Sequence, residues 1–139
     1  MQTGSCVQTG PRLPPPRLLA SIIADTRKPG FMKWCWPQLG ALLRLMASLK
    51  PGGRMIEIGT GTGVGTCWLL DGMDEAAKLT TVDIDPKVRA IARAHRGGDP
   101  RLTILSEDGA ALIRRDFQRL YIDWSSGVVV IVRLGVERP

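Results

Sequence analysis

The stretch MIEIGTGTGVGTCWLL, residues 55 to 70, places four alternating glycines between two apolar segments. Residues 54–58 before the glycines are typical of a buried strand, and residues 64–70 after them are typical of a helix. Glycine has no Cβ, so it lets the backbone approach a ligand closely and adopt a positive φ in a tight turn. In an open parallel sheet, ligands bind beyond the carboxyl ends of the strands. The stretch therefore predicts a strand, a ligand-binding loop and a helix.

The chain downstream repeats the alternation of strand and helix that is typical of α/β architecture. We expect, in order, a strand at 79–83, a helix at 86–96, a strand at 102–105, a helix at 110–115 and a strand at 120–123. Strands separated by helices pair in parallel through right-handed crossovers. The predicted fold class is α/β, a parallel sheet with flanking helices.

Two further helices are predicted upstream of the glycines, one at 17–25 and one that begins at Pro37 and stops at the turn 50–53. Apolar residues recur at helical spacing in the second helix, which predicts a core face; they are Leu39, Leu42, Leu43, Met46 and Leu49. His95 is expected to be a partly exposed helix residue, because no acidic or cysteine partner lies near it in sequence.

Composition and charge limit the classes of protein. The chain has 139 residues and a net charge of +6, and residues 1–50 carry all of the excess. These basic residues are scattered, so a solvated face is favoured over a nucleic-acid site. No apolar run approaches the ~20 residues of a membrane span, and no secretory signal is apparent, so we expect no membrane partner and a cytoplasmic location. Cys6, Cys35 and Cys67 are expected to be free thiols.

The glycine stretch does not match two common nucleotide motifs. The dinucleotide fingerprint needs a third glycine, but its position falls on Val64 or Thr66. A phosphate-binding P-loop needs a Gly-Lys-Ser/Thr ending that the stretch lacks. Instead, the stretch contains an acidic residue, Glu57, two positions before a G-x-G-x-G pattern that runs from Gly59 to Gly63.

Two further stretches accompany this motif, LTTVDIDP at residues 79–86 and LTILSEDGAALI at residues 102–113. With these three stretches, the chain resembles the class I S-adenosylmethionine-dependent methyltransferases. Within that class it resembles the catechol and caffeoyl-CoA type of O-methyltransferase. The resemblance covers roughly residues 37 to 123 and implies a Rossmann-like fold. In that family the glycine loop wraps the methionine and ribose parts of the cofactor. By position, this role falls to Glu57, Gly59, Thr60, Gly61 and Gly63.

The resemblance implies two more cofactor-binding elements. Asp83, followed by Ile84, stands where the family grips the ribose hydroxyls, and a carboxylate suits this role because it accepts two hydrogen bonds. Asp85 is the competitor for that role, but its neighbour Pro86 favours a helix cap. Asp108 and Gly109 match the position where an acid accepts from the adenine amino group. Acids here would also stabilise a helix start without any ligand.

The resemblance weakens near the end of the chain. Asp123 stands where metal-dependent relatives place their first metal ligand, and we take it as the candidate catalytic residue. The other ligands are not apparent, so no functional metal site is expected. Residues 128–132 begin too soon after 120–123 for a parallel crossover, which leaves a hairpin or an added edge. We therefore expect a sheet that is incomplete at the C-terminus, in a fragment of a longer methyltransferase.

The predicted organisation is a disordered leader at 1–16, N-terminal helices at 17–50, a cofactor-binding core at 51–123 and an atypical tail at 124–139. The predicted function is S-adenosyl-L-methionine-dependent O-methylation of a small molecule. A non-catalytic cofactor-binding remnant and an NAD-dependent oxidoreductase are the alternatives. A half-sheet with an apolar edge favours instability, aggregation or a homodimer. Four aromatic and apolar residues are candidates either for the acceptor pocket or for plain packing; they are Phe31, Met32, Trp34 and Trp36.

Overall fold

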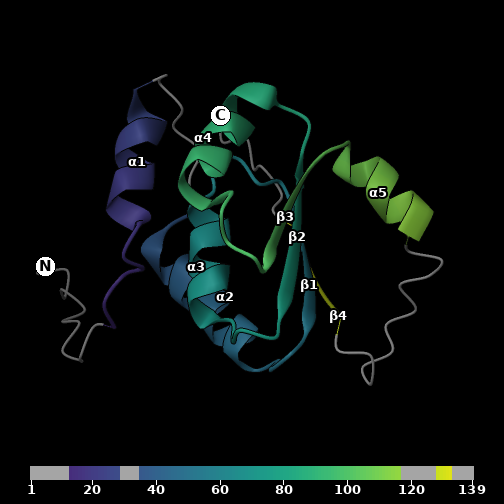
Figure 1. Ribbon diagram of the computed structural model, residues 1–139, viewed down its shortest axis with the longest axis horizontal. Coiled ribbons are helices and arrows are strands. Elements are labelled where there is room, and N and C mark those ends of the chain that lie inside the picture. Colours follow the sequence, from purple (N-terminus) through teal and green to yellow (C-terminus); the bar gives the residue numbers. More distant parts are fainter. Residues whose placement is uncertain (1–12, 29–34, 117–127, 133–139) are drawn as a thin grey trace, which may run out of the picture.

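A parallel four-stranded sheet forms the centre of the molecule (Figure 1). The computed structural model describes residues 13–28, 35–116 and 128–132. The strand order is β3-β2-β1-β4 and every neighbouring pair is parallel. The strands are β1 (Arg54–Ile58), β2 (Lys78–Asp83), β3 (Leu102–Ser106) and β4 (Val128–Val132). The helices are α1 (Leu19–Arg27), α2 (Pro37–Ser48), α3 (Val64–Gly72), α4 (Pro86–Arg96) and α5 (Gly109–Asp116).

Six predicted elements between residues 54 and 116 are confirmed, with ends within two residues of the prediction. The predicted helix at 17–25 is α1, shifted by two residues. The α/β class is therefore confirmed, and the alternation of β-branched strands with helices was enough to predict it. The strand predicted at 120–123 lies outside the described residues.

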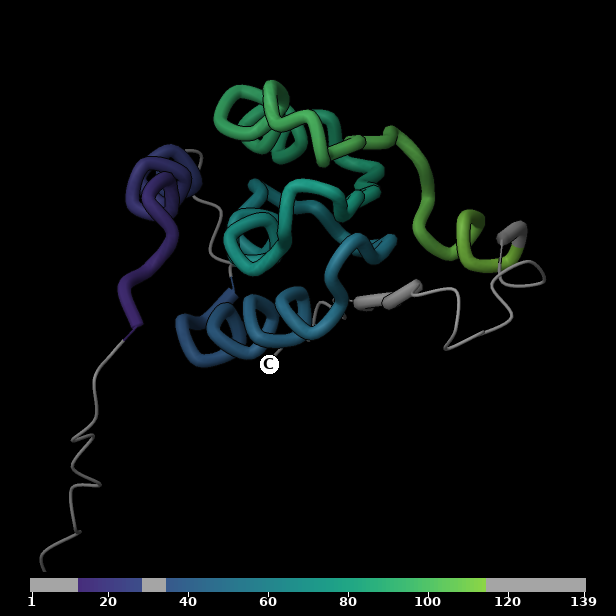
Figure 2. Tube along the Cα trace, turned by 60° about the horizontal axis from the view of Figure 1, so that its bottom comes forward, coloured from purple at the N-terminus to yellow at the C-terminus, as the bar shows by residue number. Residues whose placement is uncertain are grey.

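Helices α1 to α4 cover one face of the sheet, and α5 lies on the other (Figure 1). On the covered face, α2 packs against α3, α1 contacts both α3 and α4, and α4 contacts β3. Figure 2 shows α2, α3 and α4 side by side in that order. Every residue of α3 from Val64 to Leu70 is buried, so α3 is the central element of this layer.

Two glycines allow α2 and α3 to approach closely. A Cβ on Gly40 of α2 would overlap the ring of Trp68, and a Cβ on Gly72 of α3 would overlap the backbone of Arg44. The guanidinium of Arg44 lies over the Trp68 ring, 4.8 Å from its centroid, and pairs with Asp71 at 2.5 Å. The two glycines thus allow the backbone of α2 to pack directly against the Trp68 side chain and against the backbone of α3.

The predicted core face of α2 is wrong for four of its five residues. Only Leu43 is buried, with Gly40 and Ala47 beside it. The other four are exposed, namely Leu39, Leu42, Met46 and Leu49. The periodicity predicted the helix correctly, but α2 turns its smallest residues toward α3 because Trp68 occupies the space in front of them.

β4 occupies the edge of the described sheet, parallel to β1. Residues 128–132 are therefore an added edge, one of the two arrangements expected, whereas a hairpin with residues 120–123 lies outside the described residues. The 21 residues between β3 and β4 include α5, which is long enough for a parallel crossover.

Two findings concern the cysteines and membrane spans. Cys35 and Cys67 are both buried and neither forms a disulfide within the described residues, as predicted, whereas Cys6 lies outside those residues. Burial raises the pKa of the Cys67 thiol above its usual range. None of the helices in the described ranges has the length and apolar character needed to cross a bilayer.

Candidate functional site

The loop between β1 and α3 is built on glycines in the left-handed region. Gly59, Gly61 and Gly63 have φ values of 93°, 53° and 91°. L-residues with a side chain rarely adopt such values, so the sequence needs glycine at all three positions. The amides of Gly59 and Thr60 both donate to the carbonyl oxygen of Val82, at 2.9 and 3.0 Å. The loop is therefore anchored to the carboxyl end of β2.

Asp83 joins this loop to the end of β2. Its Oδ2 accepts a hydrogen bond from the amide of Gly61 at 2.7 Å, and its Oδ1 accepts from the amide of Asp85 at 2.9 Å. A carboxylate has about four acceptor positions, so both oxygens retain capacity for a ligand. Arg89 of α4 donates to the Asp83 carbonyl oxygen at 2.6 Å. The structure thus brings Gly61 and Asp83 together, 22 residues apart in sequence.

Asp85 caps α4. Its Oδ1 accepts from the amide of Lys87 at 2.8 Å, and Pro86 occupies the first turn of the helix. This confirms the capping role that the sequence favoured for Asp85. Ile84, between the two acids, leaves 73% of its surface exposed.

Glu57 lies beneath the loop, and only 1% of its surface is exposed. Its Oε2 accepts from Thr66 of α3 at 2.5 Å and from Thr81 of β2 at 2.8 Å. The hydroxyl of Thr81 also lies 2.7 Å from that of Thr60 in the loop. Glu57 therefore connects loop, strand and helix from the inside of the molecule, and the motif alone did not reveal the threonines that hold it.

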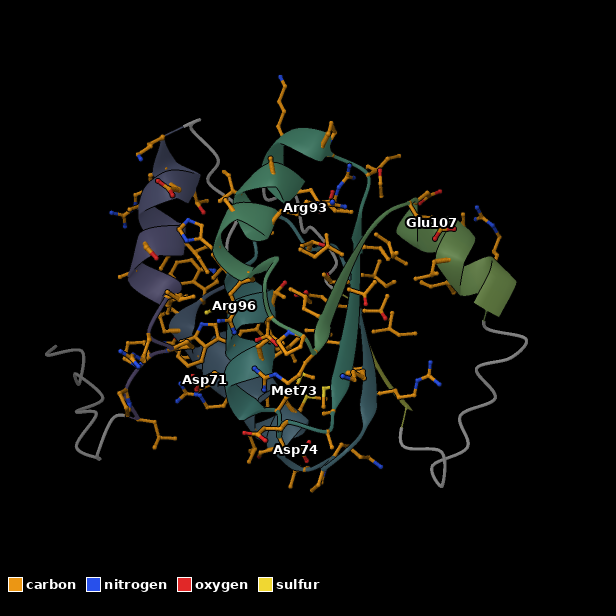
Figure 3. The ribbon with its side chains drawn as sticks, in the orientation of Figure 1. Asp71, Met73, Asp74, Arg93, Arg96 and Glu107 are labelled. Atoms are coloured by element: carbon orange, nitrogen blue, oxygen red, sulfur yellow. The ribbon has the colours of Figure 1, made fainter. Side chains whose placement is uncertain are left out.

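The carboxyl end of β3 is more open. The carboxyl of Asp108 is exposed and accepts from the amide of Ala110 at 2.9 Å, which supports the start of α5. A Cβ on Gly109 would overlap the side chain of Ile58, so this glycine lets α5 begin close to β1. Figure 3 places Glu107 at this end of the sheet, and Met73 and Asp74 at the opposite end.

α1 makes two polar contacts that sequence reasoning missed. The hydroxyl of Thr26 lies 2.8 Å from the hydroxyl of Thr62 in the glycine loop, and both residues are buried. Nε2 of His95 on α4 lies 2.8 Å from Oδ2 of Asp25. Hydrogen bonds from Lys28 and His95 lower the pKa of the Asp25 carboxyl. The partners lie 36 and 70 residues apart, so no local pattern could have found them.

The remaining candidate residues lie either outside the described residues or at an exposed position. Asp123, Phe31, Met32 and Trp34 lie outside the described residues. Trp36 is described, and it is 73% exposed at the start of α2. Within the described ranges no group of three or more His, Cys, Asp or Glu residues could hold a metal ion.

Comparison with known proteins places this site in context. A family model described as a methyltransferase domain matches residues 56–131, from β1 into β4. A relative from Mycolicibacterium smegmatis, provisionally named an O-methyltransferase, is 46% identical over 57 residues, which cover 41% of this chain and 27% of the relative.

Solved structures share the fold. The O-methyltransferase from Bacillus cereus in complex with SAH superposes with a TM-score of 0.66 at 20% identity, covering 78% of this chain and 51% of that one. A Klebsiella pneumoniae protein, provisionally named an O-methyltransferase, gives 0.63 at 25% identity, covering 78% and 50%. The sheet and helices thus form a Rossmann-like methyltransferase fold. The chain spans about half the length of these two structures, and the aligned segment about a quarter of the mycobacterial relative.

Proposed function

Because the chain belongs to the methyltransferase domain family, whose model matches more than half of it, we propose that it binds S-adenosyl-L-methionine and O-methylates a small molecule. The relative and the solved structures named above support the proposal through their own names, one of which includes bound SAH, S-adenosylhomocysteine. The fold supports cofactor binding at the carboxyl ends of β1, β2 and β3.

One observation carries the proposal, namely the contact between the Gly61 amide and the Asp83 carboxylate. It places a bare backbone and an acid side by side at the ends of two adjacent parallel strands. An adenosyl ligand needs both, because its ribose hydroxyls donate to a carboxylate and its bulk needs space at the loop. The residues present fit this group, since Asp83 retains acceptor capacity.

Each candidate cofactor-binding residue has a proposed role at this site. The backbone of Gly59, Thr60, Gly61 and Gly63 would line the methionine and ribose end of the cofactor. Asp83 and the exposed Ile84 would contact the ribose and the adjoining ring, and Asp108 would accept from the adenine amino group beside Gly109. Glu57 would act from beneath by holding the loop, as its buried contacts with Thr66 and Thr81 imply.

S-adenosyl-L-methionine supplies an activated sulfonium methyl group. Transfer to an acceptor hydroxyl forms an oxygen–carbon bond, breaks the sulfur–carbon bond and releases the hydroxyl proton. The chain must orient the acceptor in line and take up that proton. Asp123 remains the proposed residue for this step, and the acceptor remains a small molecule in the proposal.

Calorimetric titration of the purified 139-residue chain with S-adenosylhomocysteine and with NAD tests the proposal. We expect binding of S-adenosylhomocysteine only. Gly61→Val should weaken that binding by about a hundredfold or more, because valine at a φ of 53° strains the loop and fills the ligand's place. Binding of NAD alone would support the oxidoreductase, and retained affinity in Gly61→Val would reject the placement of the loop.

A second measurement separates an enzyme from a remnant. Transfer of a labelled methyl group from S-adenosyl-L-methionine to a panel of catechols and phenols should give a methylated product. Cofactor binding without transfer to any of these acceptors would favour the non-catalytic remnant.

A further inference from the structure

α1 contacts the glycine loop through a buried pair of hydroxyl groups. Thr26 is 0% exposed and Thr62 is 1% exposed, and their hydroxyl oxygens lie 2.8 Å apart. Thr26 also lies 2.6 Å from the carbonyl oxygen of Ile22, one turn back in its own helix. A hydroxyl has one proton. The Thr26 hydroxyl is the donor in both contacts, so it shares its one proton between the Ile22 carbonyl oxygen and the Thr62 hydroxyl oxygen.

The same helix is fixed to the core at two other points. Ile22, one turn before Thr26, is fully buried in the core cluster. Asp25 pairs with His95 of α4 at 2.8 Å. These contacts leave Thr26 little freedom to follow the loop if the loop moves, so α1 acts as a fixed support.

The loop also lies close to α4. A Cβ on Gly63 would lie 3.1 Å from the Cβ of Ala92, which is tighter than ordinary contact. The loop therefore contacts Thr26 of α1 and lies close to Ala92 of α4, while Asp83 accepts a hydrogen bond from Gly61 at its centre. A loop with three glycines has high conformational entropy when free, so such restraints reduce what a ligand must order on binding.

We propose that α1 braces the glycine loop, with Thr26 a positioning residue that acts on the cofactor site through Thr62. The inference rests on the proposed function for its effect on cofactor affinity, but the brace itself is a property of the ligand-free chain. By linkage, cofactor binding and docking of α1 strengthen each other. α1 lies outside the segment matched by the family model, so the coupling belongs to this chain's own N-terminal part.

The test compares matched hydroxyl variants of α1. Thr26→Val replaces the hydroxyl with a methyl group of similar size and leaves the buried Thr62 hydroxyl without Thr26 as a partner. We expect affinity for S-adenosylhomocysteine to fall about tenfold, the size of one lost hydrogen bond. Thr26→Ser should restore affinity to within about threefold of the wild type. Ser21→Ala is the control, because its exposed hydroxyl bonds only within α1, to the Leu18 carbonyl oxygen.

Hydrogen exchange gives a readout that does not depend on the cofactor. In the ligand-free chain, Thr26→Val should speed exchange of the Gly63 amide, which bonds to Thr60 within the loop, by about tenfold. A double variant with Thr62→Val should lose no more affinity than either single variant, because both remove the same contact. Additive losses would overturn the brace, as would unchanged loop exchange in Thr26→Val.

The two proposals can fail separately. If the wild-type chain does not bind S-adenosylhomocysteine, the proposed function fails, and loop exchange in the ligand-free variants still decides the brace. If Thr26→Val does not fold, Asp25→Ala replaces it, since this removes the α1 contact with His95 without burying an unpaired group. We then expect two- to threefold faster exchange in the loop, and unchanged exchange there would overturn the brace.

Discussion

Two parts of the same sheet are built differently at their carboxyl ends. Around β1 and β2, the loop backbone, Asp83 and the buried Glu57 are joined by short hydrogen bonds among buried or half-buried groups. Around β3 and α5, the Asp108 carboxyl is exposed, and its contacts with the Ala110 amide and the Arg114 guanidinium lie within its own turn or at the surface. The protein therefore fixes the groups at the methionine and ribose end of the proposed site before any ligand binds. At the adenine end, the position of the Asp108 carboxyl is less restrained by the protein.

The largest expected effect comes from breaking the buried network. Glu57→Ala would leave the hydroxyls of Thr66 and Thr81 without their buried acceptor, so we expect the free energy of unfolding to fall by about 3 kcal/mol. Urea denaturation measures this loss. Asp108→Ala is the matched control and should cost about 1 kcal/mol or less, because it removes only an exposed cap. Equal losses in the two variants would contradict the comparison.

Removing Asp83, the proposed ribose-binding acid, should weaken ligand binding at the preorganised end. Asp83→Ala should reduce the affinity for S-adenosylhomocysteine by about 2 kcal/mol, because charged hydrogen bonds are lost. Asp85→Ala removes the carboxylate that caps α4 but leaves Asp83 in place. Titration of that variant with S-adenosylhomocysteine should therefore give the wild-type affinity. If Asp85→Ala were the more damaging variant, the roles of the two acids would be reversed.

A single methyl group should distinguish two glycines, one in the loop after β1 and one in the turn before β3. Gly63→Ala places a side chain at a φ of 91° and 3.1 Å from Ala92, so we expect a loss of about 1.5 kcal/mol in unfolding free energy. A Cβ on Gly98, at the turn before β3, would meet no atom within 4 Å, and Gly98→Ala should change stability by less than about 0.5 kcal/mol. Thermal unfolding followed by circular dichroism compares them.

The smallest effect concerns an ion pair beside β3 and depends on pH. Hydrogen bonds from Arg101 lower the pKa of the Asp99 carboxyl. The pair therefore stabilises the fold fully above the unfolded pKa of about 3.9 and loses this contribution as pH falls through the lower folded value. Asp99→Asn should cost about 0.5 to 1 kcal/mol at pH 7. The difference from the wild type in unfolding free energy should shrink as the pH falls below about 3.9, and a constant difference across pH would exclude the charge as its cause.

The sequence predicted the elements of the sheet well because strand and helix periods are local. It also predicted Asp85 as a cap, since Pro86 follows it. It failed on the exposed face of α2, because the orientation of that helix depends on Trp68 in another element. It could not find the pairs of Thr26 with Thr62 and of His95 with Asp25 for the same reason. Such contacts are set by tertiary packing, which no spacing rule encodes.

The close packing of α2 against α3 limits which substitutions these two helices can accept. Gly40 and Gly72 have no side chain, which lets the two helices pack this closely. Any larger residue at either position would force the helices apart. Leu39 and Leu42 on the outer side meet no such limit. In a saturation library of α2, Gly40 should therefore tolerate no larger residue, whereas the exposed Leu39 and Leu42 should be free to vary.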